Sequence, residues 1–386
     1  MSAPSGAPND LRQSLAHGAA GIALLHVERA LLGAGSWQDA HAWVTEAARD
    51  DISAADNTGL FFGAPALAYV LHTACADGIA RYRSALSELD AHVTAITHRR
   101  VDAADARIGR RELTCFAEYD LLRGLTGLGA HLLAHAPGND ALGRVLSYLV
   151  CLTQPIRTDI GTVPGWWVFH DPHLADSAAF PGGHANLGLA HGISGPLALL
   201  THSLRLGITV DGHRDAIAVV CAWLDTWRQD ADAGPWWPQW ITRDELRTAR
   251  SNQRGPLRPS WCYGTPGLAR AQQLAGIATP DLRRQQMAEH ALLGAVSDPV
   301  QLGQITDISL CHGWAGLYQT VWRASRDALT PAIGASLSHL ADRLIRAGGD
   351  EDGGFLDGNA GAALALGTAT RTAPPVSGWD ACLLIN

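Results

Sequence analysis

The chain has 386 residues, of which 47% are hydrophobic and 17% charged. This balance allows a large buried core and excludes a chain that is disordered throughout. The formal net charge is −8, all 29 basic residues are arginine, and they form no basic block. That distribution argues against a nucleic-acid-binding protein.

The first ten residues are small and polar, and they carry none of the basic and apolar regions of a secretory signal peptide. No window of 18 uninterrupted apolar residues occurs, so we expect no membrane-spanning helix and a cytoplasmic location. The seven cysteines are scattered over the chain, which is more typical of reduced thiols in a cytosol than of a disulfide framework.

A short motif recurs along the chain: a glycine, two further residues, a second glycine and then an apolar stretch. Its copies begin at Gly18, Gly63, Gly124, Gly192, Gly264, Gly313 and Gly358, and the copy at Gly63 is degenerate because Ala66 replaces the second glycine. Each interval between copies has room for two helices and their connections. Missing side chains at the glycine pair allow tight turns and close approach of neighbouring backbones.

The repeat predicts one helix starting at each glycine pair and another helix before it. Apolar residues at helical spacing predict such preceding helices at 215–227 and 333–347. Seven hairpins that bury their apolar faces against one another form either a closed α/α toroid or an open solenoid with a binding groove. We expect an all-α chain that is a single domain over residues 1–386, with short irregular or β insertions between the third and fifth copies; the repeat alone leaves the toroid and the solenoid open.

The repeat register also aligns the polar residues that precede each glycine. Cys262 and Cys311 both lie two residues before their glycines in adjacent copies, and His312 follows Cys311 directly. In a closed ring these turns would lie side by side on one rim. Two thiolates and an imidazole suit zinc, and three protein ligands leave one position open, as catalytic zinc requires. The alternative is that both cysteines are small buried packing residues.

Two further polar residues belong to the same loops. His191 directly precedes Gly192, and Asp120 lies four residues before Gly124, where it can serve as a catalytic group or as a helix cap. His17 has the same local context as His191 but no evident partner. Among the other cysteines, Cys151 and Cys221 lie in or beside apolar helices, and we expect both in the core.

The tryptophan-rich segments 166–167 and 236–240 lie in the long insertions. We expect their indole rings to pack in the interior. The alternative is a rim that contacts a peptide.

These loops resemble the lanthionine synthetase C-like (LanC-like) family. The matching segments are Tyr119–Gly127 (YDLLRGLTG), Asn186–Gly195 (NLGLAHGISG), Ser260–Gly267 (SWCYGTPG), Leu310–Gly316 (LCHGWAG) and Phe355–Gly358 (FLDG). The resemblance extends from the first glycine repeat almost to the end of the chain.

The resemblance implies an α/α toroid with one zinc ion held by Cys262, Cys311 and His312. It also implies an acid/base pair formed by Asp120 and His191, supported by an arginine that corresponds to Arg258. Bacterial members of the family close thioether rings in precursor peptides whose serines and threonines have been dehydrated. The chain is too short for a fused dehydratase domain, so it resembles the stand-alone cyclase of a class I lanthipeptide (lantibiotic) pathway.

We therefore expect a lanthipeptide cyclase that forms lanthionine and methyllanthionine by Michael-type addition of peptide cysteine thiols to dehydroalanine or dehydrobutyrine. His191 is the expected proton donor, while Asp120 orients it or accepts the thiol proton. Tyr263 and Arg258 are candidates for stabilising the enolate oxygen.

The expected substrate is a dehydrated precursor peptide with its leader. Transient partners would be a dehydratase and an ABC-type exporter at the inner face of the membrane. We expect a monomer.

Three other functions fit parts of the pattern. A zinc-dependent thiol transferase would add glutathione or another small thiol to an electrophile with the same ligands. A non-catalytic scaffold would bind a modified peptide around a structural zinc, which normally has a fourth protein ligand. A toroidal glycosidase would need two carboxylates in the central cavity, where the rim positions supply only Asp120 and Asp357.

Overall fold

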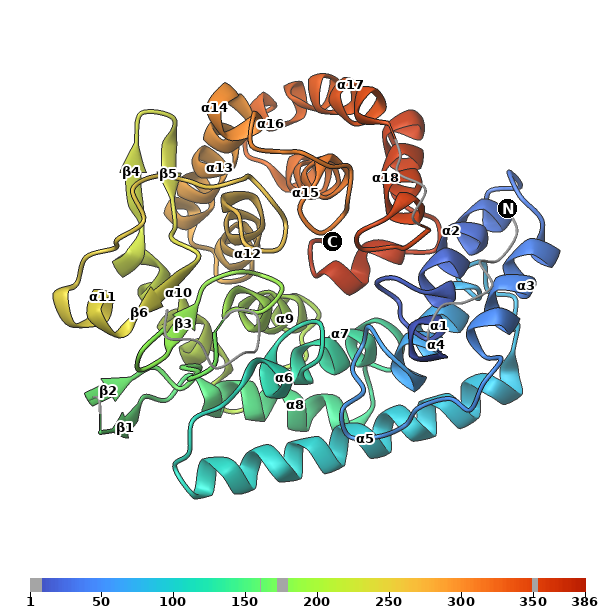
Figure 1. The fold of residues 1–386 in the computed structure, drawn as a ribbon, viewed down its shortest axis with the longest axis horizontal. Helices are drawn as coiled ribbons and strands as arrows, with labels where there is room; N and C mark the ends of the chain where they lie inside the picture. Colours follow the sequence, from blue (N-terminus) through green and yellow to red (C-terminus); the bar gives the residue numbers. More distant parts are fainter. Residues whose placement is uncertain (1–8, 160, 172–179, 349–352) are drawn as a thin grey trace.

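The structure is a computed structural model that describes residues 9–159, 161–171, 180–348 and 353–386. Helices form two concentric rings (Figure 1). The inner ring consists of α2 (Ala19–Leu31), α4 (Ala64–Thr73), α7 (Leu125–His135), α9 (Ser194–Arg205), α12 (Thr265–Ala278), α15 (Trp314–Asp327) and α18 (Asn359–Arg371). The outer ring consists of α3 (Trp37–Ala47), α5 (Arg83–Gly109), α8 (Asp140–Leu152), α10 (His213–Trp227), α13 (Leu282–Ser297) and α17 (Leu337–Ala347).

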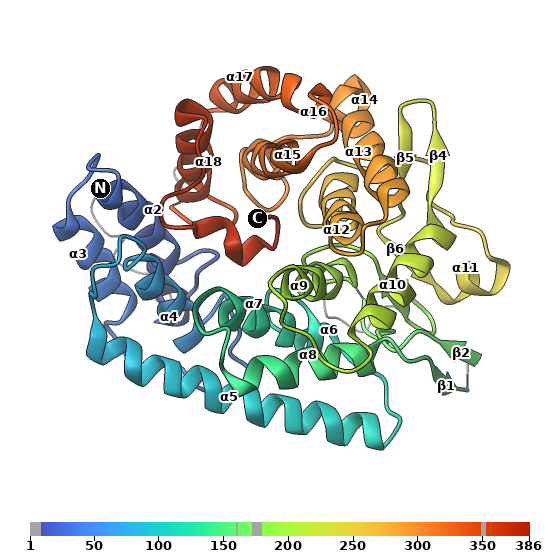
Figure 2. The same ribbon diagram turned by 180° about the vertical axis from the view of Figure 1, so that it is seen from behind.

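The ring is closed, because α18 packs against α2. Both views show the last inner helix beside the first (Figures 1 and 2). This closure confirms the toroid and excludes the open solenoid. Among the described residues, no helix combines the length and the apolar composition needed to cross a lipid bilayer.

Every inner helix begins at its glycine motif, as the repeat predicts. Six of them start directly after the first glycine, and α9 starts at Ser194, two residues after Gly192. At the second glycine of the motif, a nearby backbone carbonyl oxygen leaves no room for a side chain. A Cβ atom on Gly267 would lie 2.0 Å from the Trp261 carbonyl oxygen, and one on Gly316 would lie 1.9 Å from that of Leu310. The first helical turn therefore packs directly on the backbone of its own loop.

The loops that end at the first glycine of each copy form a ring of their own, which we call the rim. Backbone hydrogen bonds join neighbouring rim loops: Leu15 N to Phe61 O (2.9 Å), Leu121 N to Ala190 O (3.1 Å), Leu189 N to Cys262 O (2.8 Å), Cys262 N to Cys311 O (3.2 Å), Cys311 N to Leu356 O (2.9 Å) and Leu356 N to Ala16 O (2.9 Å). Between the degenerate second copy and the third, the Arg100 guanidinium makes the link. It donates to Thr58 O (2.6 Å) and Arg123 O (2.7 Å).

The other short helices and the strands lie in the connections, before the first inner helix or after the last one. The helices are α1 (Asn9–Arg12), α6 (Phe116–Tyr119), α11 (Arg243–Thr248), α14 (Pro299–Leu302), α16 (Ala332–Ala335) and the 3₁₀ helix η1 (Trp379–Leu383). Three antiparallel two-stranded sheets pair β1 (Ile156–Thr158) with β2 (Gly161–Val163), β3 (His184–Asn186) with β6 (Trp240–Thr242), and β4 (Gln229–Ala231) with β5 (Gly234–Trp236). These strands fall in the insertions between the third and fifth copies, as expected.

The insertions also contain the tryptophan pairs. Trp166, Trp167, Trp236 and Trp237 are at most 5% exposed, and the indole nitrogen of Trp237 donates to Leu224 O at 2.8 Å. Packing, rather than a peptide-contacting rim, is therefore their role. Trp240 is half-buried.

Two details differ from the sequence-based expectations. The helix predicted at 333–347 is divided into α16 and α17 at Ser336, whose hydroxyl bonds back to Ile333 O at 2.7 Å and competes with the helical backbone bonds. The core assignment holds for Cys221 and is wrong for Cys151, which is exposed. The buried face of α8 includes Val145, Leu149 and Leu152, and Cys151 points away from that face.

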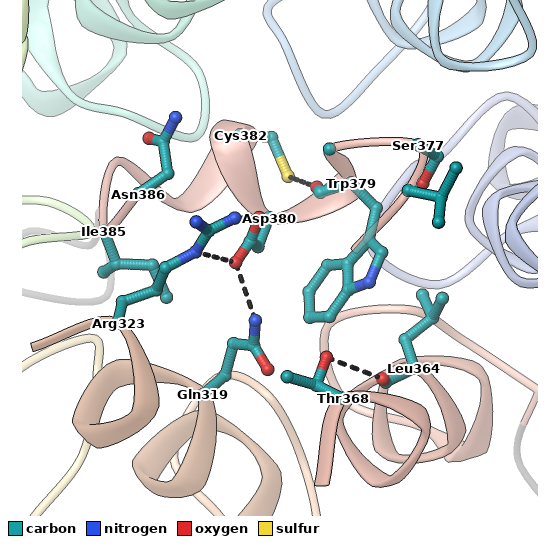
Figure 3. A network of polar contacts seen from close by, with 12 residues as sticks. Gln319, Arg323, Leu364, Thr368, Ser377, Trp379, Asp380, Cys382, Ile385 and Asn386 are labelled. Carbon is teal, nitrogen blue, oxygen red and sulfur yellow. Dashed lines mark hydrogen bonds and ion pairs between the residues drawn. The ribbon is translucent and has the colours of Figure 1, made fainter. Parts of the chain in front are cut away.

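Segment 376–386 lies across the middle of the ring (Figure 1). Its Asp380 is fully buried and accepts hydrogen bonds from Arg323 at 2.6 and 2.7 Å and from Gln319 at 2.6 Å, both on α15. Figure 3 shows this carboxylate between the two side chains. The buried Arg270 of α12 donates to Ile385 O at 2.9 Å. Side chains of the inner helices thus hold this segment in the centre of the toroid.

Candidate metal centre and acid/base pair

Four of the seven rim loops share a turn that is stabilised by the side chain four residues before the first glycine. Ser14, Ser260 and Ser309 occupy this position, and so does Asp120. The side-chain oxygen accepts the backbone N–H three residues later, for example His312 N to Ser309 Oγ at 3.1 Å. Such Asx and Ser/Thr turns hold the residue that donates this N–H, and this residue directly precedes the glycine.

Cys262, Cys311 and His312 come together on two adjacent rim loops. Each contributes a potential ligand atom, and these atoms all lie within 4.8 Å of one another. The bond from Cys262 N to Cys311 O fixes the distance between the two loops. Cys262 is buried, whereas Cys311 and His312 are half-buried, so one side of the cluster faces outward.

The electrostatics of the cluster favour deprotonation of one of its two sulfurs, because the contact with Cys262 raises the pKa of the Cys311 thiol well above its usual value. Hydrogen bonding from the Cys311 thiol, joined by His312, holds the pKa of the Cys262 thiol well below its usual value despite burial. The hydrogen bond between His312 and Cys262 in turn raises the pKa of the His312 imidazole. Two sulfurs and one imidazole nitrogen are a donor set that suits a tetrahedral zinc ion with one open position. The residues present therefore fit a catalytic zinc site.

Asp307 joins this cluster, although the sequence analysis does not single it out. One carboxylate oxygen, Oδ2, lies 3.5 Å from His312 Nε2 and 3.6 Å from an Arg258 guanidinium nitrogen. The other accepts the Ser309 backbone N–H at 2.9 Å. Metal-ligating histidines commonly direct their second ring nitrogen to a carboxylate, which fixes the ring. An acidic residue just before the cysteine–histidine pair is the signal that points to it.

Asp120 and His191 form a short contact on the neighbouring part of the rim. Asp120 Oδ2 lies 2.5 Å from His191 Nδ1, and the aspartate is fully buried. Its other oxygen accepts the backbone N–H groups of Arg123 and Gly124 at 2.6 and 2.8 Å. The carboxylate therefore both caps its turn and orients the imidazole, and its catalytic role stays a prediction.

The surroundings of His191 fix the plane of its ring. Phe116 stacks on the imidazole, with ring centroids 5.4 Å apart and an interplanar angle of 21°. Tyr119 donates its hydroxyl to His191 O at 3.0 Å. With Nδ1 facing Asp120, the remaining nitrogen, Nε2, is the one available to a substrate. Phe116 precedes its glycine by eight residues, outside the repeat motif, and the sequence analysis misses it.

Tyr263 links the two halves of the site. It follows Cys262 in the chain, and its ring lies 5.9 Å from that of His191. Burial, and next the charge of Cys262, raise the pKa of its phenol well above the usual value, so the hydroxyl remains a hydrogen-bond donor at neutral pH. Arg258, in contrast, lies with Asp307 on the sulfur side of the site.

The histidine at the first rim loop also has a partner in the structure. His17 Nδ1 lies 3.5 Å from Asp357 Oδ2, and the two residues occupy equivalent positions in the first and seventh copies. Asp357 and Asp120 therefore each face a histidine from another loop. The rim brings together every residue that the sequence analysis proposed for the site.

The comparisons with known proteins agree with this fold. A model of the family described as "Lanthionine synthetase C-like protein" matches residues 9–384. The chain therefore belongs to the lanthionine synthetase C-like family.

One similar protein is the "Nisin biosynthesis protein NisC" of Lactococcus lactis subsp. lactis, which is 24% identical over 258 residues. The match covers 64% of this chain and 60% of that protein, so the chain spans about 60% of the length of this relative. Among solved structures, "Nisin cyclase" superposes with a TM-score of 0.81 at 20% identity, over 97% of this chain and 92% of that chain. That likeness supports the toroidal fold.

Proposed function

We propose that the chain is a zinc-dependent lanthipeptide cyclase, which closes lanthionine and methyllanthionine rings in a dehydrated precursor peptide. The observation that carries the proposal is the convergence of Cys262, Cys311 and His312 beside the Asp120–His191 pair. Family membership and the names of the two similar proteins support the same reaction.

Cys262, Cys311 and His312 would hold the zinc ion. When bound there, zinc would supply a site that takes up the substrate cysteine as a thiolate, which is the nucleophilic form. The role of the two cysteinate ligands is to keep negative charge at the site so that the substrate sulfur stays reactive. Asp307 would orient the His312 ring, and the Arg258 guanidinium would balance part of the negative charge of the sulfurs and of Asp307.

The bond-forming step adds the substrate sulfur to the β-carbon of dehydroalanine or dehydrobutyrine. A carbon–sulfur bond forms, the carbon–carbon double bond breaks, and the electron pair passes to an enolate. His191 delivers a proton from Nε2 to the α-carbon, while Asp120 holds Nδ1 and stabilises the charged ring. The proton that the substrate thiol loses restores the charged form of His191, so the reaction consumes no net proton. The Tyr263 hydroxyl is suited to donate a hydrogen bond to the enolate oxygen.

The proposal extends to the organisation and partners of the chain. Residues 1–386 would act as one domain, which agrees with the closure of the ring by α2 and α18; residues 1–8 lie outside the described part. The substrate would be the precursor peptide with its leader. A cytoplasmic location, the monomeric state and transient contacts with a dehydratase and an ABC-type exporter at the membrane stay predictions.

The test begins with the zinc content of the purified protein and continues with a synthetic peptide that contains one dehydroalanine and one cysteine. We expect about one zinc per chain and loss of the peptide thiol at unchanged mass, faster than in His191→Ala. When glutathione is added to the assay, a mass increase by one glutathione would instead identify a thiol transferase. Zinc that is retained with no acceleration of either reaction would favour the non-catalytic scaffold.

A further inference from the structure

A second cluster of metal-ligating side chains lies between the inner helices α4 and α7 and the outer helix α5. His72, Asp90 and His131 contribute ligand atoms that all lie within 4.8 Å of one another. His72 Nε2 lies 2.8 Å from Asp90 Oδ1. Exposure falls from the Asp90 side chain (41%) through that of His72 (18%) to His131 (1%), so the cluster leads from solvent into the core.

His131, like its neighbour His135, has a buried ring nitrogen that ordinary packing does not explain. It is buried, and its Nδ1 has no hydrogen-bond partner among the described residues. A buried polar nitrogen without a partner is unfavourable, and structures normally avoid it. Burial, together with the nearby His135 and His72, holds the pKa of His131 well below its usual value. A neutral imidazole keeps a lone pair that can bind a metal.

The helix geometry gives the cluster a favourable field for a cation. His72 lies in the last turn of α4, and α7 ends at His135, one turn after His131. Carbonyl groups at helix C-termini carry partial negative charge that attracts cations. Asp90 adds a full negative charge from α5.

The cluster is separate from the rim site. His131 follows the rim glycine Gly124 by seven residues of helix, which corresponds to roughly 10 Å along the helix axis. Along the axes of the inner helices, the cluster therefore lies toward the face of the toroid opposite the rim that carries Cys262 and Cys311. It contains no sulfur ligand.

We propose that His72, Asp90 and His131 bind a second divalent transition-metal ion, of the zinc, cobalt and nickel class. Two imidazoles and one carboxylate are typical ligands of these ions, and a water molecule can complete the coordination. Tetrahedral coordination requires His72 Nε2 and Asp90 Oδ1 to separate from 2.8 Å to roughly 3.3 Å, which the half-exposed aspartate allows. The ion would tie the outer helix α5 to two helices of the inner ring.

His135 belongs to the wall of this site and not to its ligands. Its ring stacks flat on that of His72, with centroids 4.6 Å apart and an interplanar angle of 8°. Two stacked parallel rings do not both direct a nitrogen lone pair at an ion in the plane of one of them. This arrangement supplies a matched control, because phenylalanine at position 135 keeps an aromatic ring for the stacking and removes the ring nitrogens.

The experiment is a Co²⁺ titration of the metal-free full-length protein, followed by visible spectroscopy. Co²⁺ at the rim site shows thiolate-to-metal charge transfer, whereas Co²⁺ at the second site adds d–d bands without such transfer. We expect a second equivalent with this signature in the wild type and in His135→Phe. In His131→Phe and in Asp90→Asn its affinity should fall about tenfold or more, with the rim signature unchanged.

Two safeguards keep the result decisive. His131→Phe removes a buried unpaired nitrogen and should fold at least as well as the wild type in chelator, as measured by thermal unfolding. Asp90→Asn changes a half-exposed side chain on the surface of α5 and tests the site independently. A wild type that binds no second equivalent, or a second equivalent that survives in both variants, would overturn the proposal and identify the cluster as aromatic packing or an adventitious ion only.

Discussion

At the rim, neighbouring loops are joined by backbone hydrogen bonds that recur from copy to copy. In the middle of the ring, by contrast, segment 376–386 is held by side-chain contacts that have no counterpart in the other copies. The rim turn is the same whether its capping side chain is Ser14, Ser309 or Asp120. The repeated scaffold therefore tolerates changes in the residues it displays. The centre of the ring depends on particular buried pairs such as Arg323 with Asp380. Chemistry and stability should accordingly respond to different substitutions.

The largest effect should follow loss of a sulfur ligand at the rim. Cys262→Ala leaves two of three proposed protein ligands, so zinc should be lost almost completely while the toroid stays folded. Zinc analysis and circular dichroism of the purified variant measure the two effects. Cys221→Ala is the matched control, since it removes another buried cysteine, on α10, and should keep the metal. Stoichiometric zinc in Cys262→Ala would refute the ligand assignment.

The acid/base pair should affect the rate without affecting the metal. His191→Ala should slow cyclisation of a dehydrated peptide by about 10²- to 10⁴-fold, because the proton donor is removed. Asp120→Asn keeps an oxygen for the N–H groups of Arg123 and Gly124 and loses the charge beside His191, so the rate should also fall with little change in stability. Zinc content and single-turnover kinetics separate these effects. A wild-type rate in His191→Ala would disprove its role.

The centre of the ring should respond in the opposite way. Arg323→Ala leaves the fully buried Asp380 without its charged partner, and breaking a buried ion pair on one side costs about 3–5 kcal/mol. The free energy of unfolding in urea measures this cost. Arg99→Ala removes the exposed pair with Asp56 and should cost at most about 1 kcal/mol. Equal losses in the two variants would contradict the importance of the buried pair.

A pH dependence should also originate in the interior. The buried imidazole of His202 resists protonation, because burial lowers its pKa to about 3. Its Nε2 lies 3.3 Å from Leu384 O. The unfolded chain takes up this proton near pH 6.5, before the folded chain does, so stability should fall as the pH drops below that value. Between pH 6.5 and pH 5 the contribution is about 2 kcal/mol. His202→Gln should reduce this part of the slope in urea unfolding at several pH values; an unchanged slope would exclude His202 as its source.

Most of the rim could be predicted from the sequence, because the repeat converts positions along the chain into positions on a ring. That register places Cys262 beside Cys311 although 49 residues separate the cysteines, and the structure confirms the toroid. Asp307 was missed because it lies six residues before its glycine, at a position the motif does not mark. The exposure of Cys151 was predictable in principle, since the helical spacing of Val145, Leu149 and Leu152 leaves it on the opposite face.

The centre of the ring could not be predicted in this way. Asp380 meets Arg323 across 57 residues, and Arg270 reaches Ile385 across 115 residues. These contacts have no repeated counterpart that would reveal their register. Long-range pairs of single side chains depend on how the whole ring closes, which no local pattern encodes.

The smallest effects should come from the serines that cap the rim turns. Ser14 and Ser309 are equivalent caps, but only Ser309 precedes a proposed zinc ligand, so the pair distinguishes an effect on the fold from an effect on the site. The His17 and His312 backbone N–H groups each donate to the capping serine at 3.1 Å. Ser14→Ala and Ser309→Ala should therefore each cost about 1 kcal/mol of unfolding free energy. Only Ser309→Ala should also weaken zinc binding, by about tenfold, because it loosens the turn that positions His312. Zinc affinity measured by chelator competition would separate the two variants; equal affinities would mean that the turn serves the fold alone.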